Sequence, residues 1–299
     1  MADSEVKNAE IPVIDISKPS PEVAQQVLEA ASAHGFLFIK NDGAILPLED
    51  ISNMFSLSSQ FFHQPAPQKS THAIHSAAAG GINRGWVSMA GESLDPSSEA
   101  DPKEAFNISP PHPDLQPLPH PLSDSSPAIR KFLNSCHEIC TRILTLLGSA
   151  LEIPPEAGGE TWFSDRHDES KGHSGTIFRM LYYPQTKSEN ATSIRAGAHS
   201  DYGSLTLLFR LPGQPGLEIL TASSTWAPVP VNPSPSTLSN PPILVNIGDL
   251  LSFWTNGMLK STVHRVTFSG GEERYSMAYF CHPLDEAKLE SVPGKESRV

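Results

Sequence analysis

The chain has 299 residues, enough for one large domain or two small ones, and its 33 acidic and 21 basic residues give a formal net charge of -12. This balance, with no Lys/Arg-rich run to offset it, argues against general binding to nucleic acid or to an anionic membrane surface. The start, MADSEVKNAE, lacks the apolar stretch of a secretory signal, and no apolar run is long enough to span a bilayer. We therefore expect a soluble cytoplasmic protein.

The N-terminal part predicts a strand, a helix and a second strand. Residues 11–16 alternate apolar and polar side chains, which is typical of a strand. Ser20 is a favourable N-cap and Pro21 suits a first helical turn, so we expect a helix from there to the stop at Gly35. The apolar run FLFI at 36–39 then predicts a short strand.

A second helix is predicted over 51–62, and prolines follow it. Residues 72–107, rich in Ala, Gly and Ser, give no clear signal. The proline-rich stretch 109–127 predicts an extended loop. From 128 to 152 the apolar side chains keep the helical period, which predicts a long brace helix packed against a sheet. The three cysteines are too few for a disulfide scaffold, so we expect reduced thiols in the core; they are Cys136, Cys140 and Cys281.

After Gly175 the sequence changes to short β-like runs separated by turn residues. These runs lie at 176–183, 197–209, 216–221, 226–231, 243–247, 250–255, 262–268 and 275–281. Their spacing predicts a sandwich, jelly roll or barrel. The pair Asn256-Gly257 predicts a tight hairpin that returns the chain into the strand carrying His264.

Three side chains in this region suggest a metal site. His199 and Asp201 are two residues apart, and in a strand such residues point to the same face. His264 follows on another predicted strand, and inward positions of neighbouring strands can converge. Two imidazoles and one carboxylate form the set that holds non-haem Fe(II) and leaves other coordination positions open.

Arg274 and Ser276 lie two residues apart on the last predicted strand. Fe(II) beside one carboxylate has a local charge of about +1, so a dianionic co-substrate that chelates it keeps a distal carboxylate in need of a partner. The Arg274 guanidinium matches a carboxylate in shape and charge, and Ser276 can donate to the same group. The alternatives are a salt bridge at the rim for Arg274 and an ordinary barrel residue for Ser276.

These residues lie within longer motifs that resemble the Fe(II)/2-oxoglutarate-dependent dioxygenases, in the fungal and plant branch that includes isopenicillin N synthase. The resemblance covers nearly the whole chain. Its motifs are IPVIDIS at 11–17, AASAHGFLFIKNDG at 30–43, FFHQP at 61–65, KEAFNI at 103–108, FRMLYYP at 178–184, GAHSDYGSLTLLF at 197–209, PGLEI at 215–219, NIGDLLSFWTNGMLKSTVHRV at 246–266 and ERYSMAYFCHP at 273–283.

The resemblance implies a mainly β fold with flanking helices: a double-stranded β-helix (jelly roll) core at about 175–283 and an α/β N-terminal region. We expect an N-terminal region over 1–127 and a brace helix plus core over 128–299. The implied metal ligands are His199, Asp201 and His264. The implied 2-oxoglutarate contacts are Arg274, Ser276 and Tyr183.

The implied activity is oxidation of a small organic molecule in secondary metabolism by Fe(II), 2-oxoglutarate and O2, with release of succinate and CO2. Hydroxylation is the default outcome, and desaturation or ring closure are alternatives. An oxidase of the isopenicillin N synthase type, which uses no 2-oxoglutarate, and a catalytically silent jelly-roll binding protein are the other readings. The sequence predicts no nucleic-acid or membrane partner and leaves the oligomeric state open.

Several positions near the site stay ambiguous. Leu181 stands where many plant members have an asparagine that contacts the co-substrate. Arg179 is expected to pair with an acid at the barrel edge rather than to line the site. Met180, Leu208 and Phe280 are the expected apolar pocket lining.

Overall fold

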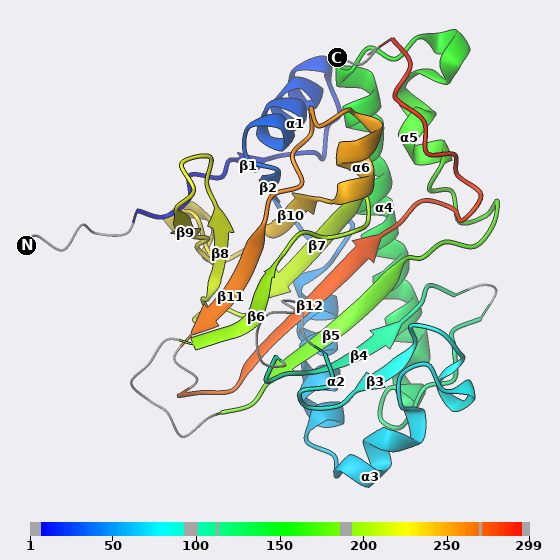
Figure 1. Ribbon diagram of the computed structural model, residues 1–299, viewed down its shortest axis with the longest axis vertical. Helices are drawn as coiled ribbons and strands as arrows, with labels where there is room; N and C mark the ends of the chain where they lie inside the picture. Colours follow the sequence, from blue (N-terminus) through cyan, green and yellow to red (C-terminus); the bar gives the residue numbers. More distant parts are fainter. Residues whose placement is uncertain (1–6, 93–100, 112–113, 186–192, 269–270, 295–299) are drawn as a thin grey trace, which may run out of the picture.

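The computed structural model describes residues 7–92, 101–111, 114–185, 193–268 and 271–294 (Figure 1). Its helices are α1 (Pro21–Ala33), α2 (Leu48–Phe62), α3 (Ala66–Lys69), α4 (Ser126–Ala150), α5 (Trp162–Asp165) and α6 (Asp249–Trp254). Its strands are β1 (Val13–Ile14), β2 (Phe36–Ile39), β3 (Gly85–Val87), β4 (Glu104–Ile108), β5 (Ile177–Tyr183), β6 (Ser193–His199), β7 (Leu205–Arg210), β8 (Leu217–Leu220), β9 (Trp226–Pro228), β10 (Ile243–Ile247), β11 (His264–Phe268) and β12 (Arg274–Cys281).

These strands form two sheets. The larger has the order β1-β2-β10-β7-β12-β5-β4-β3 and the smaller the order β6-β11-β8-β9. From β5 to β8 the chain alternates between the two sheets, and it returns to the smaller one at β11 before ending in β12 of the larger. This alternation is that of a double-stranded β-helix. The expected fold class is confirmed, with β1 to β4 of the N-terminal α/β region adding to the larger sheet.

Two apolar clusters fill the spaces on either side of the larger sheet. One joins the sheet to α1, α2 and α4, and the other joins β2 and β10 to strands of the smaller sheet. Figure 1 shows α4 running along the larger sheet. Phe132 of α4 is fully buried, with its ring centroid 5.2 Å from that of Phe178 and 5.3 Å from that of Phe209. Burying such a side chain is worth about 1.5–3 kcal/mol, so the predicted brace helix stabilises the sheet.

The N-terminal elements form where the sequence predicts them. The Ser20 hydroxyl accepts a hydrogen bond from the Val23 amide at 3.3 Å, and Pro21 opens α1. The expected strand at 36–39 is β2. In the stretch that gave no signal, β3 and β4 extend the larger sheet beyond β5. Two strands of low local propensity thus form because a neighbouring strand supplies their hydrogen-bond partners.

The expectation of one strand over 197–209 is wrong. β6 ends at His199 in the smaller sheet, and β7 begins at Leu205 in the larger. The turn between them is held by the larger sheet, because the Ser204 amide donates to the carbonyl of Cys281, at the end of β12, at 2.8 Å.

The strand predicted over 250–255 is also wrong, because these residues lie mostly in α6. Leu251 and Trp254, three residues apart, are both fully buried, whereas Phe253 is exposed. A short apolar run does not distinguish a buried strand from one helical turn by periodicity. Tertiary packing decides here, since the Trp254 ring lies edge-on to that of Trp162 at 5.5 Å.

Asn256 and Gly257 therefore end a helix and do not form the predicted hairpin. Both have positive φ, 51° and 76°. The Gly257 amide donates to the Ser252 carbonyl at 2.8 Å and the Asn256 amide to the Phe253 carbonyl at 3.0 Å. This is the Schellman arrangement, which requires the same left-handed residues as a tight hairpin.

None of the described helices is both long and apolar enough to span a membrane.

The close approach of α4 to a neighbouring turn predicts an unusual substitution effect. Alanine in place of a helical glycine normally stabilises a helix by about 1 kcal/mol. A Cβ on Gly148, however, would lie 2.3 Å from the carbonyl oxygen of Glu160. We expect Gly148→Ala to lower the free energy of unfolding by about 1–3 kcal/mol. Urea unfolding would measure this, with Ser149→Ala on the same helix as control. A G148A variant as stable as the parent would contradict this packing.

Candidate active site

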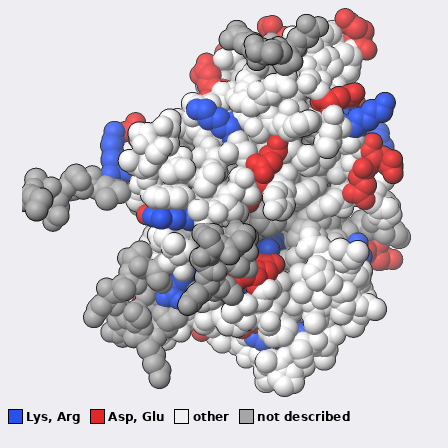
Figure 2. All heavy atoms as spheres, viewed as in Figure 1, with Lys and Arg blue, Asp and Glu red and all other residues white. Residues whose placement is uncertain are grey.

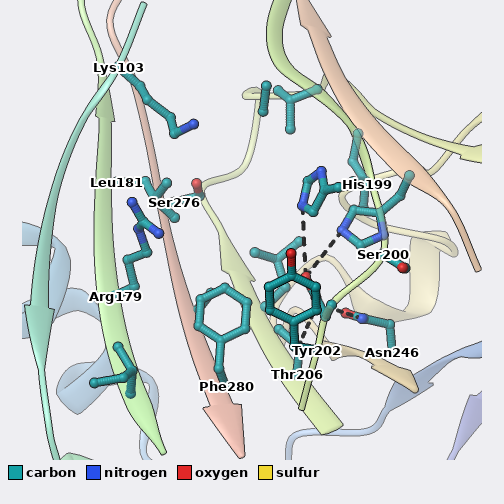
Figure 3. A pocket seen from close by; sticks show the side chains of 18 of the residues that line it. Lys103, Arg179, Leu181, His199, Ser200, Tyr202, Thr206, Asn246, Ser276 and Phe280 are labelled. Atoms are coloured by element: carbon teal, nitrogen blue, oxygen red, sulfur yellow. Dashed lines mark hydrogen bonds and ion pairs between the residues drawn. The ribbon is translucent and has the colours of Figure 1, made fainter. Parts of the chain in front are cut away.

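A cavity of about 520 Å³ lies between the inner faces of the two sheets. One wall consists of residues from β5, β7 and β12, and the opposite wall of residues from β6, β8 and β11. Figure 3 shows these two walls facing each other. On the face seen in Figure 2, the basic side chains of the described residues are scattered among acidic ones and do not gather into one basic patch.

The structure brings His199, Asp201 and His264 together at this cavity. Their potential ligand atoms all lie within 4.8 Å of one another. Asp201 Oδ1 is 3.8 Å from His199 Nε2 and 3.7 Å from His264 Nε2. These separations are too long for hydrogen bonds, and they lie below the roughly 4.2 Å that two atoms about 2.1 Å from one ion can span. The donor set would fit Fe(II), since it combines two imidazoles with one carboxylate.

The route by which Asp201 reaches this group differs from the expected one. His199 is the last residue of β6 and pairs directly with His264, the first residue of β11. Asp201 lies beyond the strand, in the turn that crosses to the larger sheet. Alternation along a strand therefore does not place the carboxylate beside the imidazole. The turn does so, because its backbone is fixed by an Asp249 amide that donates to the Asp201 carbonyl at 2.7 Å.

The ligand atoms are oriented by further hydrogen bonds. Asp201 Oδ2 accepts from the Thr206 hydroxyl at 2.6 Å and from the Asn246 amide at 2.7 Å, so Oδ1 faces the histidines. His199 Nδ1 lies 2.7 Å from the Gly197 carbonyl, and His264 Nδ1 lies 3.1 Å from the Thr262 carbonyl. A carbonyl only accepts, so each Nδ1 carries a proton, and in the neutral ring Nε2 is the nitrogen left to bind a metal. Sequence reasoning missed Thr206 and Asn246, although both lie in the quoted motifs.

The electrostatics favour a neutral His199 and an ionised Asp201. Burial lowers the pKa of His199, and the neighbouring His264 lowers it further. Burial by itself would raise the pKa of Asp201, but His264 and the donors Thr206 and Asn246 outweigh it, so that pKa lies below its ordinary value. Both residues are thus held in the protonation states that bind a metal cation.

Arg274 lies in the same cavity and is 4% exposed. Its Nε donates to the Pro215 carbonyl at 3.0 Å and its Nη1 to the Ser276 hydroxyl at 3.3 Å. The guanidinium also lies over the ring of Tyr183, 5.1 Å from the centroid. Within the described residues no carboxylate forms an ion pair with Arg274, so a salt bridge at the rim does not account for it. Burying a charge this way is costly unless an anion joins it.

A second buried cation, Arg210, was missed by sequence reasoning. It lies across from Ser276 in the pairing of β7 with β12. Its guanidinium donates to the carbonyls of Val229 at 2.9 Å and Pro230 at 2.7 Å. Burial, and then the positive charge of Arg274, lower the pKa of Arg210 to about 9. The sequence did contain a signal that could have identified Arg210 as a buried cation: it directly follows the apolar run LTLLF at 205–209.

The ambiguous positions divide between the two faces of the larger sheet. Leu181, Leu208 and Phe280 line the cavity, as does Arg179, which also pairs with the Glu92 carboxylate. The expected acid partner of Arg179 is confirmed, but the expectation that this residue does not line the site is wrong. Met180 is fully buried in the cluster under the helices, so its predicted place in the pocket lining is also wrong. Adjacent residues of a strand face opposite sides.

These features define a cavity with three potential metal ligands at one place and, at another, a buried guanidinium that has no carboxylate partner among the described residues. Two family models match the chain. Residues 174–283 match the 2OG-Fe(II) oxygenase superfamily, and residues 11–130 match the N-terminal region of a non-haem dioxygenase in morphine synthesis. The chain belongs to the 2OG-Fe(II) oxygenase superfamily, and it is a non-haem Fe(II)- and 2-oxoglutarate-dependent dioxygenase, as the resemblance implied.

Two fungal relatives cover most of the chain. A UPF0676 protein of Schizosaccharomyces pombe is 33% identical over 94% of this chain and 84% of its own length. The 2-oxoglutarate-dependent dioxygenase gloF of Glarea lozoyensis is 30% identical over 89% of this chain and 83% of its own. A Neurospora crassa protein solved with alpha-KG (2-oxoglutarate) and thymine has a TM-score of 0.78 and 27% identity, covering 99% of this chain and 92% of its own.

The donors to Asp201 generate a prediction for metal binding. Thr206→Val removes one hydrogen bond to Oδ2 while keeping the side-chain shape, so the carboxylate loses part of its orientation. Loss of such a supporting partner typically costs 10–100-fold in metal affinity. We expect Fe(II) to bind about tenfold or more weakly in an anaerobic titration. Thr267→Val, a matched change on β11 outside the cavity lining, should leave the affinity unchanged. Equal affinity in both variants would contradict the orienting role.

Proposed function

We propose that His199, Asp201 and His264 hold the iron of this dioxygenase and that Arg274, with Ser276 and Tyr183, binds the distal carboxylate of 2-oxoglutarate. The observation that carries the proposal is that a buried guanidinium without a carboxylate partner among the described residues shares one cavity with the metal-binding group. The dianion would chelate the metal at one end and reach this guanidinium with the other.

Charge balance supports this arrangement. An Fe(II) ion beside the Asp201 carboxylate leaves about one positive charge, and Arg274 adds another. A dianionic co-substrate neutralises both in an enclosed site. Arg210 is buried on β7, directly across from Ser276 of β12, and adds further positive potential there. Free carboxylates are therefore attracted to this end of the cavity.

The bound iron and 2-oxoglutarate supply the oxidising chemistry, in which O2 is consumed, succinate and CO2 are released and the substrate is oxidised. The chain's own residues orient and shield the reactants. Thr206 and Asn246 hold the Asp201 carboxylate in one orientation. The side chains of Leu208, Ala278 and Phe280 give the adjoining wall an apolar surface that excludes water from the reacting groups.

We propose that the substrate is a small organic molecule and that hydroxylation is the default reaction. The Neurospora crassa protein was solved in complex with both alpha-KG and thymine, and the cavity of about 520 Å³ in this chain is large enough for a ligand of the size of thymine. Desaturation and ring closure remain alternatives. We further propose action in the cytoplasm and in secondary metabolism; the three buried, free cysteines are compatible with a reducing compartment.

Substitution of the two ends of the site should separate metal binding from co-substrate binding. His199→Ala removes a metal ligand, so we expect loss of Fe(II) binding and of 2-oxoglutarate turnover. Arg274→Leu leaves the metal ligands intact, so we expect Fe(II) binding close to that of the parent but a KM for 2-oxoglutarate raised at least tenfold, because a buried charge-assisted contact is lost. Arg265→Leu, outside the cavity lining, serves as the control.

Release of labelled CO2 from carbon 1 of 2-oxoglutarate measures this turnover. Turnover that persists in the His199→Ala variant would contradict the metal assignment. Fe(II) binding and O2 consumption by the parent without labelled CO2 would favour an oxidase of the isopenicillin N synthase type. Failure of the anaerobically reconstituted parent to bind Fe(II) would favour a silent binding protein.

A further inference from the structure

His282 lines the cavity but has no role in the proposed metal and co-substrate sites. It directly follows Cys281, the last residue of β12, and its side chain is half-buried. Neither ring nitrogen has a hydrogen-bond partner among the described residues, and neither is fully buried. His282 also lies outside the group of potential metal ligands formed by His199, Asp201 and His264. The imidazole therefore presents unused, accessible hydrogen-bonding atoms to the cavity.

Two glycines hold this imidazole in a slot. A Cβ on Gly203 would lie 3.0 Å from Nε2 of His282, and one on Gly175 would lie 3.4 Å from its Nδ1. The backbone of His282 is fixed as well, because its amide donates to the Thr176 hydroxyl at 3.1 Å and its carbonyl accepts from that hydroxyl at 3.3 Å. The ring is thus confined by packing and not by hydrogen bonds, which leaves both nitrogens free for a ligand.

The strand register places His282 beyond the potential metal ligands, away from the co-substrate end. The inward side chains of β12 are those of Arg274, Ser276, Ala278 and Phe280, and His282 continues this row. Thr206, which donates to the Asp201 carboxylate, pairs directly with Phe280. The carboxylate is therefore bound level with Phe280, between Arg274 and His282. A 2-oxoglutarate molecule that reaches from Arg274 to the metal leaves His282 to the organic substrate.

The side chains next to His282 on the larger sheet are apolar. Phe280 pairs directly with Ile177 of β5, and both side chains line the cavity. Figure 3 shows the Phe280 ring pointing from β12 into the cavity. A ligand in contact with these side chains and with the imidazole has an apolar body and a hydrogen-bonding group.

The charges near the imidazole favour a neutral group on the ligand. Burial lowers the pKa of His282 below its ordinary value and outweighs the opposing effect of the Asp201 and Asp285 carboxylates, so the ring is uncharged at neutral pH. A neutral imidazole has one donor and one acceptor nitrogen, and a hydroxyl group can pair with either. An anionic group would face the two carboxylates here, whereas the buried Arg274 lies at the other end of β12.

We infer that His282 recognises a neutral hydroxyl group of the organic substrate, whose apolar body lies along Phe280 and Ile177. His282 is then a residue that determines substrate specificity. Phenols and other hydroxylated ring compounds have the required chemistry. The inference rests on the proposed function, because it places the substrate in the cavity with the potential metal ligands and assigns the Arg274 end to 2-oxoglutarate.

Calorimetric titration of the full chain, loaded anaerobically with Fe(II) and 2-oxoglutarate, tests the inference. The probes are para-ethylphenol, which carries the hydroxyl; para-ethyltoluene, in which a methyl group of similar size replaces it; and para-ethylbenzoate, an anion. We expect the loaded parent to bind para-ethylphenol more tightly than para-ethylbenzoate. The reverse order, or no binding of para-ethylphenol, overturns the inference.

Variants show whether His282 is responsible. His282→Phe keeps a ring in the slot but removes both nitrogens, so the ratio of para-ethylphenol to para-ethyltoluene affinity should fall about fivefold or more, as expected for one lost hydrogen bond. Comparing the ratio between proteins cancels the difference in hydration of the two probes. His34→Phe is the matched control, since His34 is exposed at the end of α1 and outside the cavity lining.

His282→Leu repeats the test with a smaller side chain, and circular dichroism checks that each variant is folded. A ratio that is unchanged in the folded His282 variants, or that falls equally in His34→Phe, overturns the assignment. Binding of 2-oxoglutarate is measured in each sample before the probes are added. Its absence in the parent contradicts the proposed co-substrate site, whereas normal 2-oxoglutarate binding with a ratio that does not respond to His282 contradicts only the hydroxyl contact.

Discussion

The Asp201 carboxylate is the group on which the site depends, because its two oxygens join the two sheets. Oδ2 accepts from Thr206 and Asn246, which are direct partners on β7 and β10 of the larger sheet. Oδ1 faces His199 and His264, which are direct partners on β6 and β11 of the smaller sheet. The larger sheet supplies the donors that a buried carboxylate requires through one cross-strand pair, and the smaller sheet places one cross-strand pair of imidazoles opposite the other oxygen. The spacing between the sheets and the geometry of the three side chains are therefore set together.

The turn that carries Asp201 also depends on a close backbone contact between Gly248 and Gly203. A Cβ on Gly248 would lie 2.1 Å from the Gly203 carbonyl oxygen, so only glycine fits there. The Gly248 amide donates to the Ser204 carbonyl at 2.9 Å, next to the contact between Asp249 and Asp201. The start of α6 therefore serves as a platform for the turn. This gives the sequence Gly248-Asp249 a structural role that its position between apolar runs did not reveal.

The sequence predicted which residues meet at the cavity better than it predicted their local structure. His199, Asp201, His264 and Arg274, which line one cavity, were singled out from residue types and motifs, and these do not depend on a correct element boundary. The break between β6 and β7 and the helix α6 were missed, because each depends on contacts with distant segments that leave no periodic signal. Asn107 is the clearest case. Its strand falls within the motif KEAFNI but has no clear periodic signal, and the register with β5 shows where it lies in the sheet.

The inward face of β12 shows how strand register divides the cavity between different ligands. Arg274, Ser276, Ala278 and Phe280 all line it, and they change along the strand from a charge to a hydroxyl, a methyl and an aromatic ring. The intervening Tyr275, Met277 and Tyr279 are buried in the cluster against the helices. A slip of one residue would put this apolar set into the cavity and the guanidinium into the core. The energetic cost of that exchange fixes the register, and the same register separates the end of the cavity with the buried guanidinium from the apolar wall at Ala278 and Phe280.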